Sequence, residues 1–406
     1  MTPLHDLARR FVAWEAQDEA VAARTLDAAG AFLAGAATAE GRALLQHAAD
    51  WDSGVPAAVA RRVAVVRMTE LDDVHMPSCT TPGAVVVGTA ITIGAELAVD
   101  AARYRRAVEV GYEALTRLGT AIDGAHVVYR GVWPTYFGAP FAAAAVVASL
   151  LDLDARRTTN ALGLALTRAT GLGSGIVGAR LGRWLTVGDA ARAGCSSAFA
   201  AQDGFVADVD LARLAASSGI ALDPAPLQAD APAAVQEVSV KPFPAAKQTV
   251  AATEAALRLR DHVERGPVRV YVPEQYVAMV AGAPLAESRL SRISSARWSV
   301  VLALARPSEL HDVARAAAVD DPELSAVARL VEVIADPELS RFYPKQFPAR
   351  VEAEGLSETV VDATGDPPHG NNFEAVDAKW RARPEDVSRI RLAALAGDAA
   401  RLAELL

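Results

Sequence analysis

Two stretches within residues 129–205 decide the fold of this chain. They read Tyr129-Arg130-Gly131-Val132-Trp133-Pro134-Thr135-Tyr136-Phe137-Gly138 and Arg183-Trp184-Leu185-Thr186-Val187-Gly188-Asp189-Ala190-Ala191-Arg192-Ala193-Gly194. Breaks marked by glycine and proline, at 131–140 and 171–182, precede alanine-rich runs at 139–151 and 190–201. A run that is apolar nearly all round belongs to a buried helix, and glycine and proline interrupt regular elements. The two stretches therefore predict buried central helices separated by loops.

Helical periodicity extends outward from these stretches, from Leu4 to about Ser217. Leu4, Leu7, Phe11 and Trp14 recur at spacings of three and four, which places them on one face of a helix. A further break lies at 76–83. The abundance of alanine favours helix, because alanine loses no side-chain entropy on joining one.

The pattern changes after residues 224–240, a segment rich in proline, alanine and aspartate that we interpret as a linker. Alternating β-branched segments at 268–272, 350–353 and 358–361 predict strands, and helical patterns lie at 249–262, 299–305 and 325–333. The tail, 384–406, returns to helical spacing, and we expect it to pack on the first domain. We therefore expect a mainly α protein with a smaller α+β domain. The expected boundaries are 1–237 (helical), 238–374 (α+β) and 375–406 (C-terminal helices).

Composition narrows the classes of function. The chain has 406 residues, 52% of them hydrophobic, and a formal net charge of −9 without a basic stripe, which argues against nucleic-acid binding. The longest apolar run, 139–151, is too short to span a bilayer, and charges come too early at the N-terminus for a signal peptide. Cys79 and Cys195 form no disulfide or zinc pattern, and the seven histidines have no metal-ligand spacing. We expect a cytoplasmic protein without membrane or nucleic-acid partners.

Two further motifs complete a recognisable set. Together with Asp72-Asp73-Val74-His75 and Lys241-Pro242-Phe243-Pro244, the two stretches resemble the MmgE/PrpD family, which includes 2-methylcitrate dehydratases, cis-aconitate decarboxylases and iminodisuccinate epimerases. The resemblance implies a large all-helical domain, an inserted α+β lid domain, an active site in the cleft between them, a homodimer, and no cofactor or metal.

The reactions of that family share one physical problem. A proton must leave a carbon next to a carboxylate, or the carboxylate must leave as carbon dioxide. The developing negative charge needs cations and hydrogen-bond donors, the proton needs a base, and substrate carboxylates need lysine or arginine. The resemblance therefore implies a small anionic di- or tricarboxylate as substrate.

This chain departs from the family pattern at four of five compared positions. Thr81 stands where a second histidine is expected, Trp133 replaces the histidine of Gly-Phe-His-Pro-Thr, Arg183 replaces a lysine, and Trp298 replaces a tyrosine of the decarboxylases. Threonine, tryptophan and arginine are poor bases near neutral pH, whereas arginine is an excellent carboxylate ligand. Lys241 is retained, and burial beside other cations could lower its pKa enough for it to act as a base.

The resemblance and the residue chemistry together assign roles. Lys241, His75 and Tyr129 are the candidate catalytic residues, and the candidate substrate-binding residues are Asp73, Thr81, Trp133, Thr135, Arg183 and Trp298.

Each assignment has a structural alternative. Asp73 and His75 could cap a turn, Trp133 could fill a core, and Arg183 and Lys241 could lie on the surface. Arg180 could share the role of Arg183, and His126 is either a substitute base or a structural histidine. The glycine-rich segment 171–175 follows no strand and does not predict a dinucleotide fold.

Two functions follow from these residues. The first is a lyase or isomerase that abstracts a proton alpha to a carboxylate, acting on a substrate other than methylcitrate. The second is a non-catalytic carboxylate-binding or assembly protein on the same scaffold.

Overall fold

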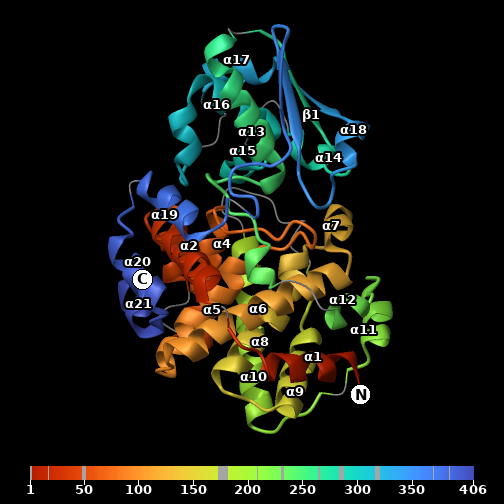
Figure 1. The fold of residues 1–406 in the computed structure, drawn as a ribbon, viewed down its shortest axis with the longest axis vertical. Helices are drawn as coiled ribbons and strands as arrows, with labels where there is room; N and C mark the ends of the chain where they lie inside the picture. The colour runs from red at the N-terminus through yellow and green to blue at the C-terminus, as the bar shows by residue number, and fades with distance from the viewer. Residues whose placement is uncertain are drawn as a thin grey trace. The chain divides into compact units, whose positions relative to one another are not determined.

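The structure, a computed structural model, describes residues 2–16, 18–47, 52–171, 182–207, 209–229, 233–263, 266–282, 288–315, 321–368, 370–383 and 385–406. Its contacts divide the chain into two compact units. The first comprises the described parts of 1–176, 181–240 and 367–406, and the second contains Lys241–Asp366. Figure 1 shows the helices of the first unit and the small sheet with its helices in the second. The prediction of a mainly α protein with a smaller α+β part is confirmed.

The first unit is built from helices. They are α1 (Pro3–Val12), α2 (Asp18–Ala36), α3 (Ala39–Gln46), α4 (Val55–Met68), α5 (Pro82–Glu96), α6 (Ala101–Ala121), α7 (Gly124–Val127), η1 (Val128–Arg130), α8 (Pro134–Leu150), α9 (Ala155–Leu166), α10 (Arg183–Gln202), α11 (Leu211–Ser218), α12 (Ala225–Gln228), η2 (Ala234–Gln236), α19 (Phe373–Arg381), α20 (Ser388–Ala396) and α21 (Ala399–Leu405).

Helix α8 forms the centre of the first unit. It packs against α5, α6, α9 and α10, and all but one of its residues are buried. Small residues permit this packing: a Cβ at Gly194 of α10 would lie 2.2 Å from the carbonyl oxygen of Pro140 in α8. The alanine-rich run of α8 therefore forms a buried helix, as its composition predicts. The prediction is wrong for the run in α10, since only 10 of the 20 residues of that helix are buried.

The C-terminal helices complete the first unit. Helix α19 packs on α2, where a Cβ at Gly30 would lie 2.5 Å from the indole of Trp380. Helix α20 packs on α2, and α21 packs on α5. Chain segments from opposite ends of the sequence thus share one core.

The second unit contains a four-stranded sheet and several helices. In chain order they are α13 (Lys247–Leu259), η3 (Arg260–His262), β1 (Val268–Val272), α14 (Val277–Val280), α15 (Arg289–Ile293), α16 (Ala296–Ala305), η4 (Pro307–His311), α17 (Pro322–Ala328), β2 (Val331–Ala335), α18 (Pro337–Ser340), β3 (Ala349–Ala353) and β4 (Leu356–Val360).

The sheet has the order β2-β1-β3-β4. Strand β1 pairs in parallel with β2 and antiparallel with β3, and β3 pairs antiparallel with β4. Helix α13 packs against β3 and β4, and α16 packs against α13. The second unit therefore places helices on a mixed sheet, which is an α+β arrangement.

Three expectations about local structure are wrong. The helix expected over 325–333 ends at Ala328, and its last part is strand β2, because Val331, Val333 and Ile334 extend the sheet beside β1. The break expected at 131–140 ends earlier, since α8 begins at Pro134 and contains Pro140. The supposed linker 224–240 holds α12 and η2, and its Ser239 forms a β-bridge with Val74.

Among the described residues, none of the helices combines the length and the apolar composition that a bilayer crossing needs.

Candidate functional site

The loop between α4 and α5 carries the first predicted site residue, Asp73. Its Oδ1 accepts a 2.7 Å hydrogen bond from the main-chain N–H of Gly83 in the first turn of α5. Its Oδ2 accepts a 2.5 Å hydrogen bond from the hydroxyl of Tyr112 in α6. A Cβ at position 83 would lie 2.8 Å from Asp73 Oδ1, so only glycine lets the carboxylate approach this closely. Asp73 therefore holds the start of α5, which is the structural alternative for this residue.

Asp73 is buried, and its charge is only partly compensated. Burial raises the pKa of Asp73 to about 6, while the charge of Arg24 and the two hydrogen bonds oppose the rise. Desolvation penalises the charged carboxylate, which explains the direction of the shift. Asp73 thus titrates close to the neutral range without being an exposed acid.

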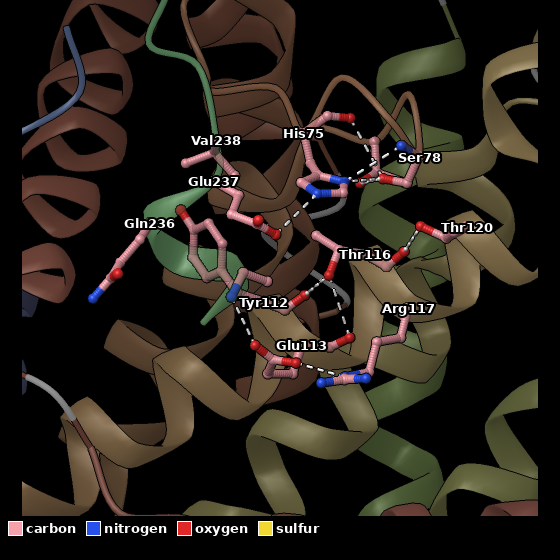
Figure 2. A network of polar contacts seen from close by, with 12 residues as sticks. His75, Ser78, Tyr112, Glu113, Thr116, Arg117, Thr120, Gln236, Glu237 and Val238 are labelled. Atoms are coloured by element: carbon pink, nitrogen blue, oxygen red, sulfur yellow. Dashed lines mark hydrogen bonds and ion pairs between the residues drawn. The ribbon is translucent and has the colours of Figure 1, made fainter. Parts of the chain in front are cut away.

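His75 lies in a tight turn two residues further on (Figure 2). Its backbone forms an isolated β-bridge with Thr80. The Ser78 hydroxyl lies 2.8 Å from Nδ1 of His75, and the main-chain N–H of Ser78 donates to the same nitrogen at 3.3 Å. Because a main-chain N–H can only donate, Nδ1 accepts and the ring proton of the neutral imidazole resides on Nε2. That nitrogen faces Glu237, whose Oε2 lies 3.8 Å away.

Thr81 and Thr135 join this loop to the central helix. The main-chain N–H of Thr81 donates a 2.9 Å hydrogen bond to the hydroxyl oxygen of Thr135, and the two hydroxyl oxygens are 3.1 Å apart. Both residues are buried. Thr81 is the residue before α5, and Thr135 is in the first turn of α8. The pair therefore brings together the N-termini of two long helices.

Arg183 brings a third helix N-terminus to the same region, because it is the first residue of α10. Its guanidinium carbon lies 3.8 Å from the centre of the Trp133 ring, and its Nε donates a 3.2 Å hydrogen bond to the Tyr136 hydroxyl. Trp133 and Tyr136 flank the start of α8, with their ring centres 5.7 Å apart. Arg183 is only 5% exposed, which excludes the surface-arginine alternative for this side chain.

A second arginine, Arg67, contacts another aromatic ring near Arg183, that of Trp184. The guanidinium carbon of Arg183 lies 5.0 Å from the Trp184 ring centre, and that of Arg67 lies 5.8 Å from it. Arg67 pairs with Glu70 and Asp72. Burial lowers the pKa of Arg67, but these two carboxylates outweigh it and the net shift is upward. Among the residues that the structure describes, Nη2 of Arg183 is buried without a hydrogen-bond partner, and so is Nε of Arg67.

Three candidates remain, Tyr129, Lys241 and Trp298. Tyr129 is half-buried in η1, and Gly131 ends that helix with a φ of 97°. Lys241 and Trp298 belong to the second unit, and both side chains are buried. The guanidinium carbon of Arg292 lies 5.7 Å from the Trp298 ring centre.

The structure also bears on the other residues that the sequence singled out. His126 is exposed, and its Nδ1 lies 2.7 Å from Asp123 Oδ1, so it is not a buried structural histidine. Arg180 and residues 172–175 lie outside the described residues. Within the described ranges, no group of histidine, cysteine and acidic side chains could hold a metal ion.

Sequence reasoning missed Tyr112, Tyr136 and Glu237 as partners of site residues. The signal that could have found Tyr136 is its position only three residues after Trp133, within the same motif. Tyr112 and Glu237 are distant in sequence from Asp73 and His75, and no local pattern marks such partners.

Two comparisons bear on this arrangement. Residues 11–220 match the family model described as the MmgE/PrpD N-terminal domain. This range contains all of the first unit's candidate residues, from Asp73 to Arg183. No curated protein matches the chain.

Proposed function

Because this chain belongs to the MmgE/PrpD family, we propose that it is a lyase or isomerase that abstracts a proton from the carbon next to a carboxylate. The family is generally of the dehydratase and lyase type. The proposed substrate is a small anionic di- or tricarboxylate, and the proposed assembly is a homodimer in the cytoplasm.

One observation carries the proposal: contacts link the N-terminus of α8 to those of α5 and α10, and Arg183 is the first residue of α10. Thr81 and Thr135 link α5 to α8, and the contacts of Arg183 with Trp133 and Tyr136 link α8 to α10. A helix N-terminus carries a partial positive charge, so the starts of α8 and α10 beside the Arg183 guanidinium favour an anion. Within the described ranges Nη2 of Arg183 has no acceptor, and a carboxylate oxygen would supply one.

The proposed chemistry assigns each group a step. Arg183 binds the carboxylate and stabilises the negative charge that develops when the adjacent carbon loses its proton. The amine of Lys241 takes that proton, with His75 and Tyr129 as further proton-transfer groups. Asp73, Thr81, Trp133, Thr135 and Trp298 orient the substrate. Return of the proton to the other face gives an isomerase, and loss of a leaving group gives a lyase. The proposal requires Lys241 and Arg183 to reach the same ligand.

The second candidate function is carboxylate binding without catalysis. Two positions favour it, because neither holds a residue that could act as a base. Thr81 and Trp133 stand where the family motifs have histidines, and neither side chain can serve as a base. The stacked Arg183 would bind a carboxylate in either case. The two candidates therefore share a ligand class and differ only in proton transfer.

Ligand binding is tested first. A panel of small di- and tricarboxylates is screened for thermal stabilisation of the wild type, Lys241→Ala and Lys345→Ala. Lys345 is an exposed lysine of the second unit and provides the matched control. We expect stabilisation that Lys241→Ala loses and Lys345→Ala keeps. If no carboxylate stabilises the wild type, both candidates fail.

Proton transfer is tested next, with a carboxylate that binds. The ligand is incubated with the protein in deuterium oxide, and exchange of its C–H next to the carboxylate is followed by NMR. The enzyme exchanges this proton at a rate that Lys241→Ala lowers at least tenfold. Binding without exchange supports the non-catalytic candidate.

A further inference from the structure

A hollow in the first unit lies apart from the residues assigned above. Its volume is about 580 Å³, and its lining comes from α2, η2, the start of α19 and α20. Sites for small molecules commonly fall between about 300 and 1,000 Å³. The hollow is therefore large enough for a metabolite.

The lining includes a buried guanidinium, that of Arg24, which is 1% exposed. Its Nη2 donates to the main-chain oxygen of Asn371. Its Nε and Nη1 have no hydrogen-bond partner within the described parts of the chain. A buried charged donor without an acceptor is costly, so two such nitrogens on one side chain indicate a missing group.

The carboxylate of Asp73 interacts with the charge of Arg24 but does not accept a hydrogen bond from its Nε or Nη1. Both oxygens of Asp73 accept hydrogen bonds from other donors, the Gly83 N–H and the Tyr112 hydroxyl. Oδ1 of Asp27 accepts from Lys379 and Trp380, at 2.6 Å and 3.0 Å, and Oδ2 of Asp27 has no partner in the described structure. Asp73 thus interacts with Arg24 through charge, while Nε and Nη1 of Arg24 have no acceptor among the described residues.

The rest of the lining restricts the ligand. Phe373 and Leu395 present apolar surface, Gln236 and Asn372 are polar and exposed, and Glu374 is acidic and exposed. A doubly charged phosphate would meet repulsion from Glu374 in the lining and from Asp73, whose charge interacts with Arg24, whereas a single carboxylate needs one guanidinium. An apolar tail would lie against Phe373 and Leu395.

We propose that this hollow is a second ligand site, which binds a small amphipathic monocarboxylate through Arg24. The carboxylate accepts hydrogen bonds from Nε and Nη1, and the tail covers the apolar wall. The site does not depend on the reaction proposed above, because none of its lining residues takes part in that reaction.

A ligand series tests the chemistry. Acetate, butanoate and hexanoate are compared with their amides and with inorganic phosphate, by thermal shift and calorimetry on the full chain. We expect stabilisation to rise from acetate to hexanoate and the amides to have little effect. Amides that stabilise as well as the acids, or phosphate that binds more tightly than hexanoate through Arg24, would overturn the proposal.

Variants locate the site. Arg24→Gln should weaken hexanoate binding at least tenfold, and Arg183→Gln should leave it unchanged. Since Arg24→Gln could also disturb folding, Leu395→Glu keeps Arg24 and places a negative charge in the hollow. Leu392→Glu is its matched control, because Leu392 is exposed on the same helix and does not line the hollow. We expect at least tenfold weaker binding for Leu395→Glu and none of this loss for Leu392→Glu.

Removal of a negative charge from the hollow provides a complementary test of carboxylate binding. Glu374→Gln removes an acidic group from the lining and should tighten hexanoate binding severalfold. Two outcomes overturn the proposal: hexanoate binding that Arg183→Gln abolishes and Arg24→Gln keeps, or a Leu395→Glu variant that dissociates a dimer without changing hexanoate binding. The second outcome would make the hollow part of a contact between two copies.

Discussion

The guanidinium carbon of Arg183 lies 3.8 Å from the centre of the Trp133 ring. Indole has the most favourable face for a cation, and a buried contact of this kind is stronger than an exposed one. The stacking holds the guanidinium in place, and the hydrogen bond from Nε to Tyr136 adds a second restraint. Trp133 and Tyr136 together thus hold the guanidinium of Arg183 at the start of α10.

Arg183→Gln should weaken carboxylate binding by at least tenfold, which corresponds to about 1.4 kcal/mol. Arg183→Lys should recover only part of this, since an ammonium cannot stack or bind a carboxylate bidentately. Calorimetry with a carboxylate that stabilises the wild type measures the effect. Arg192→Gln, at a half-exposed arginine further along α10, is the control and should bind normally. Equal losses in both variants would point to a general charge effect.

The hydrogen bond from Thr81 to Thr135 should matter for stability in an asymmetric way. Thr135→Val removes the acceptor and leaves the buried N–H of Thr81 unpaired, which costs about 1–3 kcal/mol. Thr81→Val removes only the contact between the hydroxyls and should cost less. Urea unfolding measures both, with Thr120→Ala at an exposed position of α6 as a control. A larger loss in Thr81→Val would contradict the assigned donor and acceptor.

Asp73 predicts a definite pH dependence of stability. Its pKa in the folded protein is raised to about 6 by burial, above the ordinary value of 3.8. Between these values the folded state binds more protons than the unfolded state, so the contribution of Asp73 to stability falls as the pH rises from about 4 to about 6. Below about pH 4 the buried carboxyl is protonated and does not destabilise the fold, and above about pH 6 the destabilisation by the buried charge is complete. A shift of about two units corresponds to about 3 kcal/mol.

The measurement is the free energy of unfolding from urea titrations at about pH 4.5 and about pH 7. Asp73→Asn lacks the titrating group, so the wild type should gain stability relative to the variant as the pH falls. Other groups, such as Glu254, whose pKa burial also raises, affect both proteins alike. A difference between wild type and variant that stays constant with pH would show that Asp73 titrates normally.

His75 should carry its neutral ring proton on Nε2. The main-chain N–H of Ser78 donates to Nδ1, which leaves that nitrogen as an acceptor. Nitrogen-15 NMR of the histidine rings distinguishes the two tautomers directly. Ser78→Ala removes the hydroxyl contact and keeps the main-chain donor, so the Nε2–H tautomer should persist in this variant. A signal from the Nδ1–H form in the wild type would contradict the arrangement.

Local sequence patterns were sufficient for most elements. The alternation at 268–272 coincides with β1, because successive side chains of a strand point to opposite faces. The alanine-rich run at 139–151 lies mostly in α8, since small apolar residues suit a helix buried on all sides. Strand β2 was missed because Val327, Leu330, Val331 and Ile334 are spaced like one face of a helix, and only pairing with β1 selects the strand.

The candidate site was visible as motifs but not as an arrangement. Asp73, Thr81, Trp133 and Arg183 could each be identified from resemblance and side-chain chemistry. The partners of these residues, among them Tyr112 for Asp73 and Thr135 for Thr81, come from other helices. A donor or acceptor at that separation leaves no periodic signal in the sequence.

The sequence by itself determined the helical first unit, the strand-bearing second part, and the residue types that replace the family's bases. These properties depend on residue spacing and side-chain chemistry, and both can be read directly from the sequence. The tertiary structure alone decided that the start of α8 contacts the starts of α5 and α10, and that Arg24 of α2 bonds to Asn371 at the other end of the chain. Such contacts depend on how buried helices pack around one core, because packing brings together residues that are far apart in the sequence.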